Sequence, residues 1–178
     1  MKEEIIIAGF GGQGVLSMGK ILAYSGIMQD QEVSWMPSYG PEMRGGTANV
    51  TVILSDDRIS SPVLQSYDTA ILLNQQSMDK FESMVKPGGL LIYDPNGITR
   101  HPERDDIRIF QVEATEEAAR LKSPITFNMV VLSVGLQVPE STVQLAVEIA
   151  REGREGRKVG TIFVLGDEDS VLKESRPL

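Results

Sequence analysis

The chain of 178 residues contains no cysteine and a single histidine. Without cysteine it can form no structural disulfide, supply no thiolate ligand to an iron–sulfur cluster and offer no cysteine nucleophile. The histidine, His101, lies in the polar stretch Thr99–Glu103 that follows an expected strand, so we expect a solvated loop residue and not a base or ligand. We therefore expect no catalytic residue and no metal site in this chain.

Positive charge and long hydrophobic runs are also scarce. Seventeen Lys and Arg residues face 25 Asp and Glu residues, and the formal net charge is -8. The electrostatic field of such a chain repels nucleic acid backbones and anionic membranes, so we expect neither as a partner. No segment approaches the roughly 20 apolar residues of a membrane-spanning helix. The expected location is therefore the cytoplasm.

The chain is long enough, at 41% hydrophobic residues, for one α/β domain and a tail. Short β-branched and apolar runs alternate with segments of helical periodicity, which predicts an α/β fold. We expect a single doubly wound, largely parallel, Rossmann-like sheet with helices on both faces. The predicted strands include residues 32–36, 47–54, 69–73, 89–93 and 107–112, and the predicted helices include 15–28 and 77–86.

A cluster of glycines follows the first apolar run and precedes the first helical pattern. Gly9, Gly11 and Gly14 stand at the G-x-G-x-x-G spacing, with Gly12 and Gln13 between them. The N-terminus of the following helix points its N–H groups at this loop, which favours an anion such as a phosphate. Two interpretations remain open: a phosphate-binding loop, or a tight turn whose glycines only allow the helix to pack on the sheet.

The dinucleotide fingerprint also requires an acidic residue at the end of the second strand, where it binds a ribose hydroxyl. The second strand here ends in Pro37-Ser38, whereas Asp30 and Glu32 stand at its beginning. A free-standing NAD(P)-binding oxidoreductase is therefore an alternative and not the preferred interpretation.

A second glycine-rich connection, Pro37–Gly46, leaves this strand at the edge where binding loops usually lie. Arg44 could offer a planar fork of donors to a carboxylate or phosphate, and Gly45 and Gly46 permit close approach. Arg44 could equally pair with the neighbouring Glu42. We expect this connection to lie beside the first glycine loop.

The two loops together resemble the gamma chain of 2-oxoacid:ferredoxin oxidoreductases, closest to the 2-oxoglutarate type. The resemblance rests on G-F-G-G-Q-G at Gly9–Gly14 and S-Y-G-P-E-M-R-G-G at Ser38–Gly46. It continues in N-Q-Q-S at Asn74–Ser77, G-G-L-L-I-Y-D at Gly88–Asp94 and F-N-M-V-V-L at Phe127–Leu132. It covers residues 1–137, which we take as a gamma-type α/β domain.

Enzymes of this family oxidise a 2-oxoacid with coenzyme A to an acyl-CoA and CO2 and pass the electrons to ferredoxin. The resemblance implies a non-catalytic accessory subunit that shapes the coenzyme A side of a shared active site and is inactive in isolation. It implies alpha and beta subunits as partners, with thiamine diphosphate and Mg2+ between them and iron–sulfur clusters in cysteine-bearing chains. A ferredoxin-like delta subunit is a further candidate partner, and this chain alone is expected to hold no cofactor.

The resemblance also assigns site residues. The first loop would face a phosphate-bearing ligand or a neighbouring chain, and the second would lie at a subunit contact near the substrate channel. Asn128 matches an asparagine at the start of a late helix of the family, although an N-cap or turn residue is an equal alternative. The cofactor-side residues are Gly9, Gly11, Gly12, Gln13 and Gly14, and the substrate or subunit contacts are Ser38, Tyr39, Arg44, Gly45, Gly46 and Asn128.

The remaining residues, 138–178, read as a helix-turn-strand extension. An amphipathic helix is expected through Ile149, then the charged turn Arg151–Lys158 and the strand Thr161–Leu165. Residues 141–178 resemble the opening of a diadenylate cyclase domain and end before its D-G-A and R-H-R motifs. A nucleotide-binding module truncated before a cyclase domain is thus a further alternative.

Overall fold

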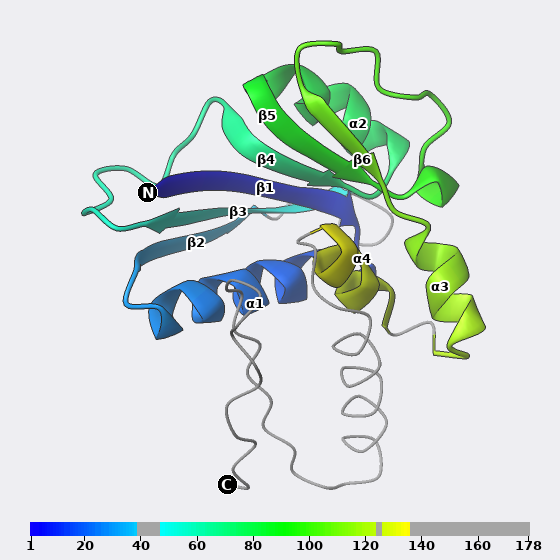
Figure 1. The fold of residues 1–178 in the computed structure, drawn as a ribbon, viewed down its shortest axis with the longest axis horizontal. Helices are drawn as coiled ribbons and strands as arrows, with labels where there is room; N and C mark the ends of the chain where they lie inside the picture. The colour runs from blue at the N-terminus through cyan, green and yellow to red at the C-terminus, as the bar shows by residue number, and fades with distance from the viewer. Residues whose placement is uncertain (39–46, 124–125, 136–178) are drawn as a thin grey trace, which may run out of the picture.

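The computed structural model describes residues 1–38, 47–123 and 126–135. Within them, six strands form one sheet in the order β2-β3-β1-β4-β5-β6 (Figure 1). The strands are β1 (Lys2–Phe10), β2 (Glu32–Ser38), β3 (Thr47–Ser55), β4 (Tyr67–Leu72), β5 (Val85–Tyr93) and β6 (Arg108–Gln111). The helices are α1 (Val15–Met28), α2 (Gln75–Phe81), α3 (Ala114–Arg120) and α4 (Phe127–Gly135), with 3-10 turns η1 (Glu82–Met84) and η2 (Pro95–Gly97).

Strand direction confirms the predicted α/β fold and adds one feature to it. β1, β4, β5 and β6 are parallel, whereas β3 is antiparallel to both of its neighbours, β1 and β2. Only residues 39–46 separate β2 from β3, which is too short a connection for a helical crossover, so the two strands pair antiparallel. The sheet is therefore mixed but mostly parallel.

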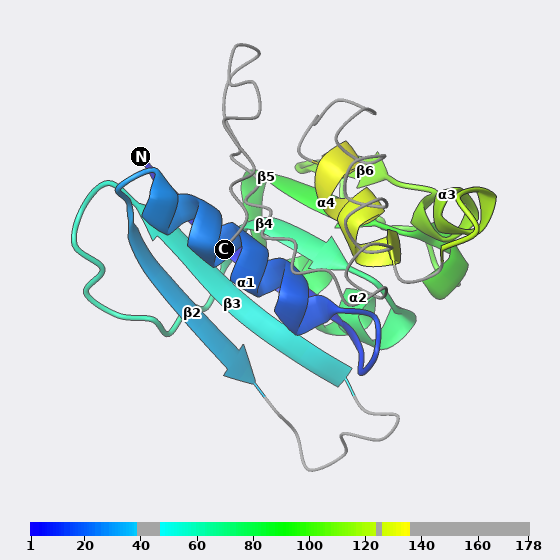
Figure 2. The same cartoon turned by 90° about the horizontal axis from the view of Figure 1, so that it is seen from below.

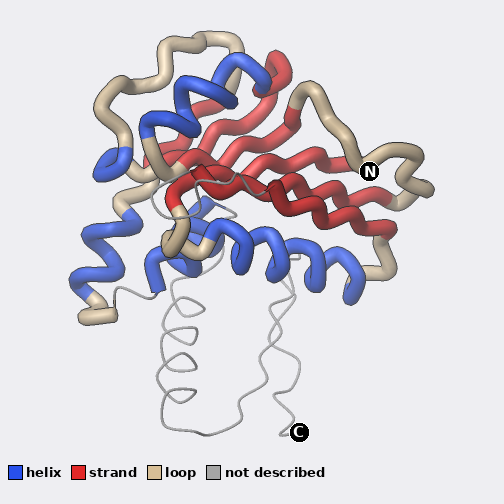
Figure 3. Tube along the Cα trace, turned by 180° about the vertical axis from the view of Figure 1, so that it is seen from behind, coloured by secondary structure: helices blue, strands red, loops and turns tan. Residues whose placement is uncertain are grey.

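The helices cover both faces of the sheet, as predicted. α1, α3 and α4 lie on one face and α2 on the other (Figures 1 and 3). In β1, Ile5 and Ile7 join the core beneath α1 and α4, and Ile6 and Ala8 join the core beneath α2. Because each face has its own apolar core, β1 is apolar at successive positions instead of at every second one.

The boundary between α2 and β5 differs from the prediction of a helix over 77–86. α2 ends at Phe81, η1 follows, and β5 begins at Val85. Lys86 is thereby extended, and its Nζ lies 2.6 Å from a carboxylate oxygen of Glu4 and 2.6 Å from one of Asp68. The pairing of β5 with β4 shifts register between Tyr67 and Thr69. The Pro-Gly-Gly at residues 87–89, which follows Lys86, is therefore an irregular part of β5. Ion pairing and strand pairing therefore override the helical spacing of Met84 and Val85.

No described helix combines the length and apolar content needed to cross a membrane.

Candidate functional site

The candidate site lies at the carboxyl edge of the sheet, where β1 and β4 end. From β1 the chain turns into α1 on one face, and from β4 it turns into α2 on the other face (Figures 1 and 2). Neighbouring strands whose following helices diverge in this way form the crevice in which open α/β sheets bind ligands. The loop of residues 9–14 and the turn at Leu73–Asn74 form this part of the edge.

Gln13 folds back into the chain. Its Oε1 accepts the backbone N–H of Phe10 at 2.6 Å, and its Nε2 donates to the carbonyl of Leu73 at 3.2 Å. The backbone N–H of Gln13 also donates to the carbonyl of Phe10 at 3.2 Å. Gln13 thus links the end of β1 to the turn after β4, a contact that local sequence could not reveal because Leu73 is remote in the chain.

The glycines of the loop serve different purposes. A Cβ on Gly9 would lie 2.6 Å from the Gln13 Oε1, and a Cβ on Gly14 would lie 2.6 Å from the Asn128 Nδ2. Gly9 and Gly14 therefore give the room that two amide side chains of the same chain occupy. Gly12 has φ of +101°, and a Cβ there would meet nothing within 4 Å. Gly11 and Gly12 are exposed, so the tip of the loop is open.

Asn128 comes from the opposite end of the described chain and meets the glycine loop at Gly14. It is the second residue of α4, which begins at Phe127, and so lies inside the helix and not before it. The structure therefore joins two residues that the sequence singled out separately. What Asn128 contacts in a complex stays a prediction.

The N-terminus of α1 is suited to an anion. Its N-cap is Gly14, in the left-handed conformation with φ of 78°, and the cap makes no side-chain hydrogen bond. No acidic residue lies in the first turn. The positive end of the helix dipole is therefore not neutralised by its own first turn, which favours a negatively charged group at the loop.

Part of the second predicted loop lies outside the described residues, namely Tyr39, Arg44, Gly45 and Gly46. Its two ends are placed by strand pairing: Ser38, the exposed last residue of β2, pairs with Asn49, and Thr47 pairs with Phe10. The second connection thus begins and ends at the edge that carries the glycine loop. Glu32 pairs with Ser55 at the other end of β3, which places it far from the loop, as expected.

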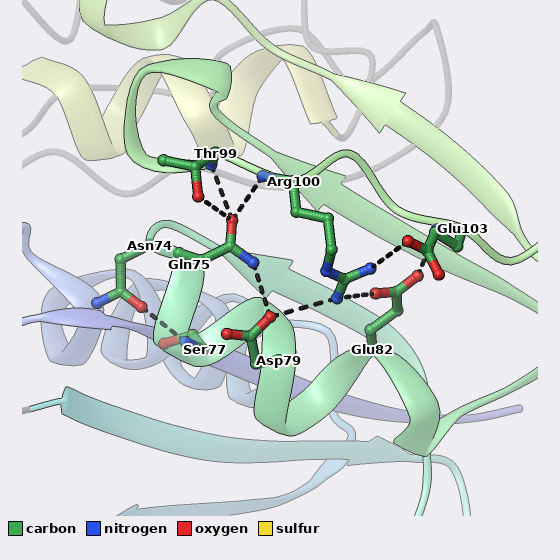
Figure 4. A network of polar contacts seen from close by, with 8 residues as sticks. All are labelled: Asn74, Gln75, Ser77, Asp79, Glu82, Thr99, Arg100 and Glu103. Atoms are coloured by element: carbon green, nitrogen blue, oxygen red, sulfur yellow. Dashed lines mark hydrogen bonds and ion pairs between the residues drawn. The ribbon is translucent and has the colours of Figure 1, made fainter.

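Two buried residues at the same edge were not predicted as site residues. Asn74 precedes α2, and its Oδ1 accepts the Ser77 N–H at 2.8 Å (Figure 4). Asp94 follows β5 and accepts the N–H of Asn96 at 2.8 Å and both the N–H and hydroxyl of Thr115 at 2.8 and 2.7 Å. Both side chains cap the elements that follow them, and an Asn or Asp directly before a helix is the sequence signal for that role.

His101 is exposed, as expected for a loop residue, but it has a partner. Its Nδ1 lies 3.1 Å from the hydroxyl of Tyr93, and the two rings meet edge to face. Tyr93 also donates to the Oε1 of Gln111 at 2.9 Å. Burial, with a smaller contribution from Glu113, raises the pKa of Tyr93, so this hydroxyl stays protonated as a donor.

Taken together, the described edge offers backbone donors, an open glycine tip and an uncapped helix start. The described residues include no group of three His, Asp or Glu side chains placed to hold a metal ion. The arrangement can bind an anionic group through its backbone, and its polar side chains mainly hold the loops in place.

The fold and this edge define a Rossmann-like α/β domain with a glycine loop at the sheet's switch point. Residues 4–161 match the model of the pyruvate ferredoxin/flavodoxin oxidoreductase family, so the chain belongs to that family. The match extends beyond residue 137, which is the expected end of the gamma-type domain.

The relatives differ in how much of their own length this chain matches. A 2-oxoglutarate synthase subunit, KorC of Methanothermobacter marburgensis, is 35% identical over 159 residues, covering 85% of this chain and 84% of the relative. A ketoisovalerate oxidoreductase subunit, VorA of Methanothermobacter thermautotrophicus, is 37% identical over 157 residues, covering 85% of this chain but 32% of the relative. The match thus covers most of the length of KorC and about a third of the length of VorA.

Solved structures share the fold. The gamma subunit of a keto/oxoacid ferredoxin oxidoreductase from Geobacter sulfurreducens superposes with a TM-score of 0.67 at 25% identity, covering 85% of each chain. A 2-oxoglutarate:ferredoxin oxidoreductase from Magnetococcus marinus, with 2-oxoglutarate, coenzyme A and succinyl-CoA bound, superposes with a TM-score of 0.71 at 24% identity. The alignment with the Magnetococcus protein covers 88% of this chain and 28% of that one.

A short match of another kind was also found. Diadenylate cyclase of Methanocaldococcus jannaschii is 61% identical over 36 residues, covering 20% of this chain and 12% of the relative. The sequence resemblance to such a domain lies at residues 141–178, outside the described part of the chain.

Proposed function

We propose that this chain is the accessory gamma subunit of a 2-oxoacid:ferredoxin oxidoreductase that converts a 2-oxoacid and coenzyme A to an acyl-CoA and CO2. The observation that supports this most strongly is the match to KorC, which covers 84% of that subunit. The same relationship favours 2-oxoglutarate as the substrate, and the match to VorA makes ketoisovalerate the substrate to compare with it.

In this proposal the glycine loop forms the coenzyme A side of the shared site. Coenzyme A carries phosphate groups, and the uncapped start of α1 behind an exposed glycine tip suits a phosphate. Ser38, Tyr39, Arg44, Gly45, Gly46 and Asn128 would form the contact to a neighbouring subunit or the substrate channel.

The redox chemistry belongs to other chains. This chain has no cysteine, so the thiolate ligands of iron–sulfur clusters must come from partner subunits. We place thiamine diphosphate and Mg2+ between the alpha and beta subunits, with ferredoxin as electron acceptor and the cytoplasm as location. A ferredoxin-like delta subunit is a further candidate partner, and the isolated chain should be inactive.

Anaerobic purification from the native host, followed by mass spectrometry of the co-purifying chains, tests the proposal. We expect stoichiometric recovery of a thiamine-dependent beta subunit and a larger alpha subunit. The recovered complex should reduce ferredoxin with coenzyme A and 2-oxoglutarate faster than with ketoisovalerate. Recovery of the chain alone or as a homo-oligomer would contradict the subunit function, and titration with NAD would then test the dehydrogenase alternative.

A second candidate function concerns the tail. The 61% identity to a diadenylate cyclase over 36 residues favours a link to nucleotide signalling. Intact-mass measurement of the native product tests it: a mass well above 19.5 kDa, with peptides of a cyclase domain, would support a fused activity. A product of the calculated mass that forms no cyclic dinucleotide would argue against it.

A further inference from the structure

We infer that Gln13 is a positioning residue: its side chain fixes the glycine loop, so that the backbone of Gly11 and Gly12, and not the Gln13 amide, meets the phosphate-bearing ligand. The identity of that ligand as coenzyme A rests on the proposed function. The positioning of the loop is a property of the isolated chain, and it can be tested separately.

The first observation is that both polar ends of the Gln13 amide are already used inside the chain. Oε1 accepts from the Phe10 N–H at 2.6 Å and Nε2 donates to the Leu73 carbonyl at 3.2 Å. With the backbone bond from Gln13 N–H to the Phe10 carbonyl, Gln13 engages both backbone polar groups of Phe10. The two side-chain bonds occupy one of the two Nε2 hydrogens and one of the two Oε1 lone pairs, and they fix the direction of the amide toward Phe10 and Leu73.

The second observation is that the chain leaves room for this arrangement. A Cβ on Gly9 would lie 2.6 Å from the Gln13 Oε1 and 3.0 Å from the Leu73 Cβ, so Gly9 and Gln13 are a matched pair. Leu73 itself is held by its N–H, which donates to the Ala8 carbonyl at 2.9 Å. The loop is therefore fastened to the first residue after β4, which is itself hydrogen-bonded to β1.

The third observation is that the tip of the loop, Gly11 and Gly12, stays exposed. The amide of Asn128 lies against Gly14 on the α4 side, and that of Gln13 lies against Gly9 on the β4 side. Between these two points, Gly11 and Gly12 are exposed. Glycines at such a tip let a ligand approach backbone N–H groups closely, and the two amides hold those groups in one conformation before the ligand arrives.

The first test measures the rate of hydrogen exchange at the Phe10 amide, with NMR on the full chain as the readout. Gln13→Met removes both side-chain bonds and should speed this exchange about tenfold. Gln13→Glu keeps an acceptor for Phe10 but loses the donor to Leu73, so Phe10 should exchange at close to the wild-type rate. Gln76→Met, at an exposed position of α2, is the matched control and should change nothing. Wild-type exchange in Gln13→Met would overturn the inference.

The second test uses the reconstituted complex. Gln13→Met should raise the KM for coenzyme A about tenfold, with kcat and the KM for the 2-oxoacid within twofold of wild type, because a disordered loop weakens binding of one substrate only. A raised KM without faster Phe10 exchange would mean that Gln13 contacts the ligand directly, which overturns the inference. Faster exchange with an unchanged KM also overturns it.

A failure of the proposed function would give a different result from a failure of this inference. If no coenzyme A-dependent activity is found with any partner, the ligand assignment is wrong, whereas the exchange experiment still reports on the loop. Gly9→Ala provides a second route, because the added methyl group would displace the Gln13 amide. Its effects on Phe10 exchange and KM should resemble those of Gln13→Met, and the double variant should add little to either one. Additive effects would contradict the pairing of Gly9 with Gln13.

Discussion

At the scale of single residues, the glycines of the fingerprint fall into two groups that the sequence motif does not distinguish. Gly9 and Gly14 leave room for the side-chain amides of Gln13 and Asn128, so their role is in internal packing. Gly11 and Gly12 form the exposed tip. The tight-turn interpretation of the motif therefore applies to Gly9 and Gly14, whereas ligand binding at Gly11 and Gly12 stays a prediction.

We expect Gly14→Ala to destabilise the chain by about 1 to 3 kcal/mol, because alanine is strained at a φ of +78° and its Cβ would collide with the Asn128 amide. Urea unfolding at neutral pH measures the loss. Asn128→Ala in the same background should recover the part due to the collision and leave the part due to backbone strain.

The matched control for this pair is Gly11→Ala. Gly11 is exposed and is not among the positive-φ glycines, so alanine there should change stability by less than about 0.5 kcal/mol. A double variant no more stable than Gly14→Ala would show that the contact with Asn128 contributes nothing to the cost.

The site residues show how far sequence reasoning reaches. The glycine loop could be predicted because its spacing and the strand and helix around it are local features. The direction of the Gln13 side chain could not be predicted, because its acceptor, the Leu73 carbonyl, is 60 residues away and lies in the turn after β4. Asn128 meets Gly14 for the same reason: only the packing of α4 beside α1 brings them together.

At the scale of elements, the connection from β5 to β6 depends on α2. It returns along the sheet with only the short turn η2, and polar side chains of α2 and η1 hold it (Figure 4). The Gln75 Oε1 accepts the Thr99 N–H at 2.8 Å, the Thr99 hydroxyl at 3.0 Å and the Arg100 N–H at 2.8 Å. Glu82, which is buried, accepts from Arg100 at 3.0 Å and from the Glu103 N–H at 2.7 Å.

We expect Gln75→Met to lower the free energy of unfolding by about 1 to 2 kcal/mol and to speed amide exchange at Thr99 and Arg100, because three donors lose one acceptor. The neighbouring exposed Gln76→Met provides the control. Unchanged exchange at Thr99 in Gln75→Met would contradict a role for Gln75 in holding this connection.

Elements with strong periodicity were predicted well, and those fixed by distant contacts were not. α1 spans the predicted residues 15–28, because its apolar positions and its glycine boundary are all in the sequence. α3 was not predicted. It is only seven residues long, and Asp94, whose carboxylate accepts the N–H of Thr115 in its first turn, lies 21 residues earlier in the chain. The reversal of β3 also escaped prediction, because strand order is set by the whole sheet.

At the scale of the whole molecule, one cluster of ion pairs lies at the edge opposite the glycine loop. Glu4 is buried near the start of β1 and pairs with Lys2 and with Lys86, whose Nζ also lies 2.6 Å from Asp68. Burial acts to raise the pKa of Glu4, but the hydrogen bonds from Lys2 and Lys86 together outweigh it and lower that pKa. Burial likewise opposes the charge of Lys86, and its bonds to Asp68 and Glu4 raise its pKa.

These shifts predict a plateau of stability. A lowered Glu4 pKa contributes stability above its unfolded value of about 4.3, and the contribution disappears as the pH falls through the folded pKa. A raised Lys86 pKa contributes below about 10.4 and is lost as the pH rises through the folded value. Urea unfolding as a function of pH should therefore show a decline below about pH 4.3 and another above about 10.4.

Lys86→Met should cost about 1 to 2 kcal/mol at pH 7 and flatten both declines, because Glu4 and Asp68 lose a shared partner that is itself partly exposed. Lys122→Met, at an exposed position, serves as the control. A Lys86→Met variant with the wild-type pH profile would show that this cluster does not cause the loss of stability at low pH.

The course of β1 has a practical consequence. Met1 lies at the amino edge, where its ammonium group pairs with Asp56, and Phe10 lies at the other end of the strand beside the glycine loop. Nine residues of extended chain separate the two ends by about 30 Å. An affinity tag or a fluorophore joined to Met1 would cost only an exposed ion pair, worth about 1 kcal/mol at most. The chain could thus be immobilised for partner capture with the carboxyl edge of its sheet facing away from the support.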